Sequence, residues 1–208
     1  MCIAILKPKD VKIDNETLRN AWDANPDGAG FAFAQDGKIM AFKSMDEDTF
    51  IGRLNSAMNK ANTAFMIHFR IATQGTINLD NAHPFAVNKN LFFCHNGIIP
   101  NMPKSREISD TRFFNMDILQ KLPFKLNNKT HDTLIANAIG YSKLIFLNSS
   151  EEYQIVNEHL GTWQAGAWHS NLSACATAES FLTDDELGEE WAFNGMAWNK
   201  QLTMKGLK

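Results

Sequence analysis

Short apolar runs alternate with amphipathic segments along the first 170 residues of the chain. Runs of strand length that end at polar or turn-forming residues are predicted as β-strands. These runs cover residues 2–6, 29–34, 38–43, 64–71, 91–94, 144–147, 153–156 and 162–169. The second and third runs flank Asp36-Gly37, a dipeptide typical of a two-residue turn, so we expect them to pair as a hairpin.

Four further segments carry apolar residues at helical spacing and are predicted as α-helices. The clearest contains Phe50, Leu54 and Met58, each four residues after the last, and begins behind Asp46 as its N-cap. Asn15 is the expected N-cap of the first helix. The other three helices cover residues 15–25, 110–120 and 130–139.

The order of these elements predicts an α+β fold in which helices cover β-sheets. The sequence contains no internal repeat, low-complexity tract or linker, so we expect a single domain over residues 1–208. After about Thr183 an acidic run and scattered aromatic residues leave the pattern of elements undefined.

Composition narrows the classes of function. Of the 208 residues 44% are hydrophobic, which is ample material for a core. With 20 basic and 23 acidic residues the net charge is −3, so we expect neither nucleic acid nor a membrane surface as a partner. No stretch approaches the ~18 apolar residues of a membrane span. Three widely spaced cysteines form no disulfide framework, and we expect a cytoplasmic protein.

Cys2 follows the initiator methionine directly. If Met1 is removed, Cys2 carries both a thiol and a free α-amino group, with ordinary pKa values near ~8.5 and ~7.7–8. Proton transfer between the two groups is then nearly balanced, and the resulting thiolate can attack an amide carbonyl. The alternative is that Cys2 is a small buried apolar residue.

A second candidate segment runs from Ile67 to Gly75 and contains Arg70 and Thr73. Arg70 lies at the end of a predicted strand, where an arginine commonly forms a surface ion pair. A guanidinium in this position can also bind a carboxylate through two hydrogen bonds, with Thr73 and backbone N–H groups as additional donors.

Two polar groups follow later in the chain. Asn96-Gly97 is typical of a type I′ hairpin turn. Alternatively, the Asn96 amide and the Gly97 N–H are two donors that suit the oxyanion of a tetrahedral intermediate. Asp110 begins a predicted helix, either as its N-cap or as a carboxylate that binds an ammonium group.

In this order the motifs resemble the class II glutamine amidotransferases, whose glutaminase domain is an N-terminal-nucleophile hydrolase. The resemblance covers residues 2–115. It implies that Cys2 is the nucleophile, that its own α-amine is the base, and that Asn96 and Gly97 form the oxyanion hole. It rests on six segments: Met1-Cys2, Asp27-Gly28-Ala29-Gly30, His68-Phe69-Arg70-Ile71-Ala72-Thr73-Gln74-Gly75, Asn81-Ala82-His83-Pro84, His95-Asn96-Gly97-Ile98-Ile99 and Ser109-Asp110-Thr111.

The resemblance also implies a substrate and a fold. Arg70 and Thr73 would bind the α-carboxylate of glutamine, and Asp110 its α-ammonium group. The fold would be a four-layer αββα sandwich of two antiparallel sheets flanked by helices. The chain departs from the family pattern at Ile3, where the family often has glycine, and at Ile71 and Gln74, where it usually has tryptophan and histidine.

We therefore expect an enzyme that hydrolyses the side-chain amide of glutamine through a Cys2 thioester. We expect no cofactor and no metal, because the histidines lack metal-ligand spacing and no glycine-rich phosphate loop is present. The ammonia would pass to a separate synthase or ligase subunit. Two alternatives stay open: an amidase of the same fold that acts on a γ-glutamyl compound or another amide, and a non-catalytic binding or regulatory domain.

Overall fold

The apolar runs form two antiparallel sheets in the computed structural model, which describes residues 1–175. The larger sheet runs from edge to edge through β3 (Lys38–Ser44), β2 (Ala29–Gln35), β4 (Phe65–Phe69), β1 (Ile3–Lys7), β10 (Ala167–His169) and β9 (Thr162–Gln164). The smaller sheet runs through β5 (Phe85–Asn88), β6 (Leu91–Asn96), β7 (Lys143–Asn148) and β8 (Tyr153–Val156).

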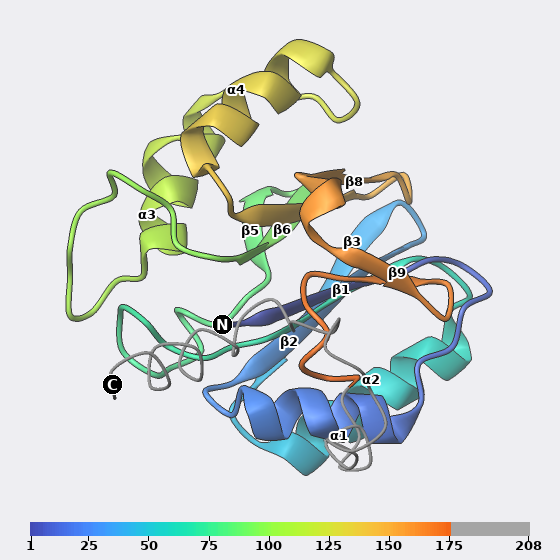
Figure 1. Cartoon of the computed structure of the whole chain (residues 1–208). Helices are drawn as coiled ribbons and strands as arrows, with labels where there is room; N and C mark the ends of the chain where they lie inside the picture. Colours follow the sequence, from blue (N-terminus) through green and yellow to red (C-terminus); the bar gives the residue numbers. More distant parts are fainter. Residues whose placement is uncertain (176–208) are drawn as a thin grey trace, which may run out of the picture. The chain divides into compact units, whose positions relative to one another are not determined.

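Helices cover the outer face of each sheet (Figure 1). The larger sheet is covered by α1 (Asn15–Ala24) and α2 (Glu47–Lys60), and the smaller sheet by α3 (Asp110–Asp117) and α4 (Lys129–Ile139). Two short 3-10 helices complete the regular elements within residues 1–175: η1 (Leu119–Lys121) and η2 (Glu158–Leu160).

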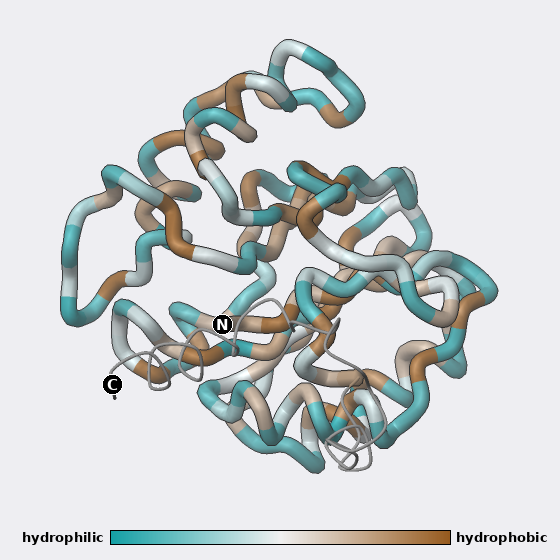
Figure 2. Tube along the Cα trace, in the orientation of Figure 1, coloured by the Kyte–Doolittle hydropathy of each residue, from teal (hydrophilic) through white to brown (hydrophobic). Residues whose placement is uncertain are grey.

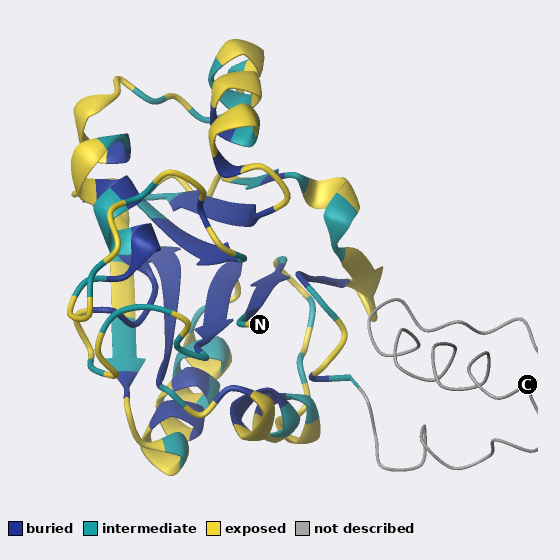
Figure 3. Ribbon diagram, turned by 60° about the vertical axis from the view of Figure 1, so that its left-hand side comes forward, coloured by how far each residue is buried: buried dark blue, intermediate teal, exposed yellow. Residues whose placement is uncertain are grey.

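Three apolar cores separate the layers, and β1 contributes to two of them. Ile3 and Ile5 point into the core beneath α1 and α2, while Ala4 and Leu6 point into the core between the two sheets. Burial on both faces explains why residues 3–6 of the strand are all apolar instead of alternating with polar residues. Most strand residues are accordingly buried (Figure 3), and hydrophobic segments follow the strands, whereas hydrophilic ones mark the loops (Figure 2). The expected αββα layering is present.

The sequence located most elements and misplaced several boundaries. The hairpin at Asp36-Gly37 is confirmed, with both residues at positive φ. The N-cap of α1 is Asp14 rather than Asn15, because the Asp14 carboxylate accepts the Thr17 N–H at 2.7 Å. The run at 162–169 is two short strands joined by a turn, and β5 was not predicted.

Two further expectations concern the extent of the chain. Within residues 1–175, no helix is both long and apolar enough to cross a lipid bilayer. The expected single domain over 1–208 extends past the described residues, and the undefined pattern after Thr183 lies outside them.

Gly30 is required where β2 passes close to the loop before β5. A Cβ at this position would overlap the backbone oxygen of His83 and lie 3.0 Å from that of Phe42. We expect Gly30→Ala to destabilise the protein by about 1–3 kcal/mol, as overpacking does, and to lower Tm in a thermal melt by roughly 2–4 °C per kcal/mol.

Gly52→Ala is the matched control. Gly52 lies inside α2, and a methyl group added there would have no neighbouring atom within 4 Å apart from the backbone of its own helix. There alanine should raise stability by roughly 0.5–1 kcal/mol, because glycine is the poorer helix former. Equal shifts of Tm in the two variants would contradict the packing argument.

Candidate active site

The pairing of β1 with β4 brings Cys2 to the residues that follow β4. Ile3 faces Phe69 at the end of the ladder, so Cys2 lies beside Arg70 and Ile71. The Cys2 sulfur is 3.4 Å from both the nitrogen and the oxygen of Ile71, accepting a hydrogen bond from the N–H and donating one to the carbonyl. The thiol is therefore held at the point where the chain leaves the larger sheet.

Arg70 is buried, with 3% of its surface exposed. Its guanidinium donates to the carbonyl oxygens of Thr76 and Gln74, at 3.0 and 3.1 Å. No carboxylate within residues 1–175 lies within ion-pair distance of Arg70, so the surface ion pair considered for it is wrong. Burial lowers the pKa of the guanidinium from its ordinary value. The guanidinium carries five N–H groups, and within residues 1–175 only the contacts with Thr76 and Gln74 use them, so further donors remain for a ligand.

Asn96 ends β6, and its side chain reaches across to the nucleophile candidate. Its Nδ2 donates to the backbone oxygen of Cys2, which also accepts the Nδ2 of Asn171 at 2.8 Å. Gly97 follows at φ 135°, and a Cβ there would overlap the Ser142 side chain. The chain then continues as a loop to α3 instead of pairing with β6, so Asn96-Gly97 is not a hairpin turn.

Asp110 is the first residue of α3 but not its cap. The cap is Ser109, whose hydroxyl accepts the Arg112 N–H at 3.2 Å, so the N-cap interpretation of Asp110 is wrong. The buried Asp110 carboxylate accepts the N–H groups of Ile99 and Thr111, at 2.8 and 2.7 Å. It thus joins the loop after β6 to the start of α3.

These residues meet around one small cavity. Five of the six predicted site residues line it: Cys2, Arg70, Thr73, Gly97 and Asp110. The sixth, Asn96, contacts Cys2 as described. The cavity has a volume of about 20 Å³, which is enough for about one water molecule. Glutamine is much larger, so this conformation is closed around the thiol.

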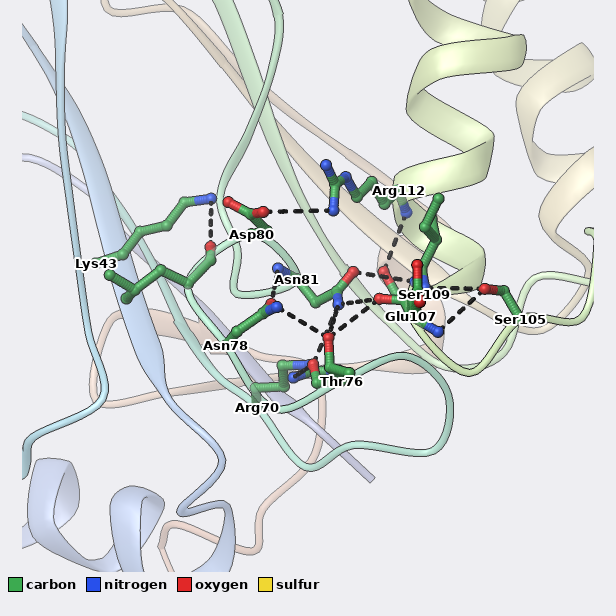
Figure 4. Close-up of polar contacts among 12 residues, drawn as sticks. Lys43, Arg70, Thr76, Asn78, Asp80, Asn81, Ser105, Glu107, Ser109 and Arg112 are labelled. Carbon is green, nitrogen blue, oxygen red and sulfur yellow. Dashed lines mark hydrogen bonds and ion pairs between the residues drawn. The ribbon is translucent and has the colours of Figure 1, made fainter.

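The loop that follows β4 is hydrogen-bonded to the loop before α3, and Figure 4 shows the contacts that Asn81 makes with Glu107 and Ser109. The Gln74 amide donates to the Pro103 and Ile108 oxygens, both at 3.0 Å. The buried Asn81 side chain donates to the Glu107 oxygen at 2.7 Å and accepts the Ser109 N–H at 3.0 Å. Gln74, one of the departures from the family pattern, therefore ties the loop that follows Arg70 to the loop before α3.

Three buried histidines cluster at the cavity, and two of them, His83 and His95, line it. The rings of His68 and His83 are 3.9 Å apart, and His95 Nδ1 is 2.7 Å from the Thr111 hydroxyl. Burial lowers the pKa of His68 to about 3 and that of His95 to about 4, so both are neutral at pH 7. Among the described residues, no group of three histidine, cysteine or acidic side chains has the geometry to hold a metal ion.

Burial also raises the pKa of the Cys2 thiol above its ordinary value. The Ile71 N–H, the positive chain terminus and Arg70 act in the opposite direction but do not offset the loss of water. Met1 is 73% exposed, and with Met1 in place the Cys2 nitrogen is an amide that cannot accept a proton. The thiol then has no adjacent amine as a base.

Comparison with known proteins supplies the family. The sequence profile "Glutamine amidotransferases class-II" matches residues 3–116, which are 114 of the 208 residues. The chain belongs to the class II glutamine amidotransferases. This confirms the resemblance found in the sequence, whereas the roles of individual residues remain proposals.

Two known proteins show how far the similarity extends. A protein named "Putative glutamine amidotransferase" from Haemophilus influenzae is 30% identical over an alignment of 104 residues, and the match covers 46% of this chain and 35% of that protein. The structure of glutamine phosphoribosylpyrophosphate (PRPP) amidotransferase from B. subtilis, complexed with ADP and GMP, matches with a TM-score of 0.54 and 18% identity, over 84% of this chain and 42% of that one. The chain thus spans less than half the length of either protein. The structural match confirms the N-terminal-nucleophile hydrolase fold.

Sequence reasoning missed three polar residues that contact the candidate site or the loops beside it. Asn171 binds the Cys2 oxygen from 169 residues away, and no local pattern marks it. Lys143 donates to Asn96 from the start of β7, a position where a lysine is usually solvated. Asn81 belongs to one of the six family motifs, but its contacts with the loop before α3 had no signal in the sequence.

The raised pKa of the Cys2 thiol has a measurable consequence. In protein that retains Met1, alkylation of Cys2 by iodoacetamide should be slower at pH 7 than that of a free thiol and should reach its maximum at higher pH, because only the thiolate reacts. Peptide mapping by mass spectrometry measures the rate at Cys2 alone. A short peptide with the sequence of residues 1–6 is the reference. The burial argument would be contradicted if the alkylation rate of Cys2 in the protein reached half its maximum at the same pH as in the peptide or at a lower pH.

Proposed function

We propose that this protein hydrolyses the side-chain amide of glutamine through a thioester on Cys2, after removal of Met1. The observation that carries the proposal is the shared cavity, where a thiol lies together with a guanidinium and a carboxylate. A free amino acid carries a carboxylate and an ammonium group, and Arg70 and Asp110 are their charge complements. Membership of the class II glutamine amidotransferases supports glutamine as that amino acid.

The first half of the proposed reaction forms the thioester. The α-amine of Cys2 accepts the thiol proton, and the thiolate attacks the amide carbon of glutamine. The carbonyl oxygen becomes an oxyanion that accepts hydrogen bonds from the Asn96 amide and the Gly97 N–H. As the C–N bond breaks, the amine returns the proton to the leaving nitrogen, and ammonia departs.

The second half restores the enzyme. Water adds to the thioester carbon while the α-amine accepts a proton from it. The C–S bond then breaks to release glutamate, and the amine returns the proton to the departing sulfur, which restores the thiol. We further propose that a separate synthase or ligase uses the ammonia. Because this chain spans only 35% and 42% of the two similar proteins, they do not identify that partner.

Binding glutamine requires the cavity to enlarge. The Arg70 guanidinium still has free donors, and Thr73 stands exposed beside it on the loop that follows β4. In the proposed complex these two residues bind the α-carboxylate, and Asp110 binds the α-ammonium group while it keeps its backbone contacts. The hydrogen bonds of Gln74 and Asn81 are those that must rearrange.

The decisive experiment measures conversion of glutamine to glutamate alongside the intact mass of the protein. Protein that begins at Cys2 should be active, and protein that retains Met1 should be inactive because it lacks the amine base. Cys2→Ala should abolish turnover yet bind glutamine in calorimetry, since the charged contacts lie elsewhere. Full activity with Met1 in place would exclude the proposed base, and binding without turnover by the processed protein would favour a regulatory domain.

The charged contacts give a separate prediction. Arg70→Met and Asp110→Asn each remove one charge and should each raise KM for glutamine by about one to two decades, because a charge-assisted hydrogen bond contributes about 1.5–3 kcal/mol. Arg19→Ala, which removes an exposed arginine that pairs with Glu47 on α2, should leave KM unchanged. The Tm of each variant is measured as well, so that a change in glutamine binding can be distinguished from a loss of stability. If neither charge matters for glutamine, a γ-glutamyl or other amide without a free amino-acid head becomes the better substrate.

A further inference from the structure

Lys143 is a buried cation without an anionic partner among residues 1–175. It begins β7 directly opposite Asn96 on β6, and 9% of its surface is exposed. Its Nζ donates to the Asn96 Oδ1 at 3.4 Å, and no carboxylate in the described range pairs with it. Burial lowers its pKa from the ordinary value. Burying a charge without an opposite charge beside it is energetically unfavourable. The one side-chain contact of Lys143 in the described range, with Asn96, is therefore the place to look for its role.

The contacts of Asn96 fix which way its amide points. An ammonium group only donates, so the atom that faces Lys143 must be the oxygen. A backbone carbonyl only accepts, so the atom that faces the Cys2 oxygen must be the nitrogen. The two contacts lie at opposite ends of the amide and agree, which removes the usual ambiguity between the two orientations of an asparagine.

One donor of Asn96 is left over. The amide nitrogen carries two hydrogens, and one of them is on the Cys2 oxygen. The second has no acceptor among the described residues. Asn171 donates to the same Cys2 oxygen at 2.8 Å and so helps to hold the residue that Asn96 contacts.

We propose that Lys143 is a positioning residue that holds Asn96 with one N–H directed at the reacting carbonyl of the substrate. The inference rests on the proposed function. Lys143 anchors the amide oxygen, and its charge polarises the amide, so the spare N–H becomes a stronger donor to the oxyanion. Lys143 itself does not touch the substrate.

The test compares Lys143→Met with Lys143→Gln in processed protein. Lys143→Met should lower kcat for glutamine about tenfold to a hundredfold, the order expected for a misplaced catalytic group, with KM changed less than about twofold. Lys143→Gln keeps a donor for Oδ1 and should lose less. Lys7→Met is the control, because Lys7 is a buried lysine of β1 whose Nζ donates to the Pro8 and Thr63 oxygens and lies over the Phe65 ring, with no contact to Asn96. It should lower Tm and leave kcat unchanged.

A double-mutant cycle with Asn96 separates positioning from general damage. Asn96→Ala should lower kcat by about 10²–10³, as the loss of an oxyanion donor does. In that background Lys143→Met should have no further effect, because the group that it positions is absent. If Lys143→Met lowers kcat by the same factor with and without Asn96, the inference is wrong.

A second readout does not depend on activity. The side-chain amide signals of Asn96 in a ¹⁵N NMR spectrum, assigned by their absence from Asn96→Ala, should shift in Lys143→Met and not in Lys7→Met. Unchanged Asn96 signals would overturn the inference. If the processed protein does not hydrolyse glutamine while these signals shift, the proposed function fails and the contact between Lys143 and Asn96 stands.

Discussion

The antiparallel pairing of β1 with β4 determines where the candidate nucleophile lies. Five residue pairs join the two strands, beginning with Ile3 opposite Phe69. A slip by one residue would turn Ile3 and Ile5 away from the core under the helices and into the space between the sheets. Because β1 is buried on both faces, the two cores together exclude that slip. Cys2, one residue before the ladder, is thereby held beside Arg70.

The smaller sheet supplies the other half of the site. The core between the sheets holds β6 against the larger sheet, so the end of β6 brings Asn96 to the Cys2 backbone. Arg70 and Lys143 are buried cations with no carboxylate partner within residues 1–175. Stability alone disfavours such groups. Local violations of the rules of stable folding concentrate at functional sites. Arg70 lines the cavity beside the Cys2 thiol and Lys143 contacts Asn96, whereas Lys7, a third buried cation without a carboxylate partner in this range, lies at the other end of β1.

Sequence patterns correctly predicted the features that depend on interactions between residues close together in the chain. The turn at Asp36-Gly37 and the α2 face of Phe50 and Leu54 depend on neighbours within a few residues, and both were predicted correctly. Asn96-Gly97 carries the same turn signal as Asp36-Gly37, but no strand follows within pairing distance, and tertiary contacts determine its conformation. The family motifs identified the residues around the cavity. The contacts of residues distant in sequence, such as Asn171 with Cys2, could not be predicted, because they depend on how the two sheets stack.

The closed cavity links substrate binding to the loop that follows Arg70. The guanidinium now donates to the carbonyl oxygens of Gln74 and Thr76, which belong to that loop. The same loop is tied to the segment before α3 through Gln74 and Asn81. Displacing the loop therefore removes contacts from the buried cation, and a carboxylate is a stronger acceptor than the carbonyl groups that it would replace. A ligand with a carboxylate can compensate the opening of the loop, whereas a neutral amide of the same size cannot.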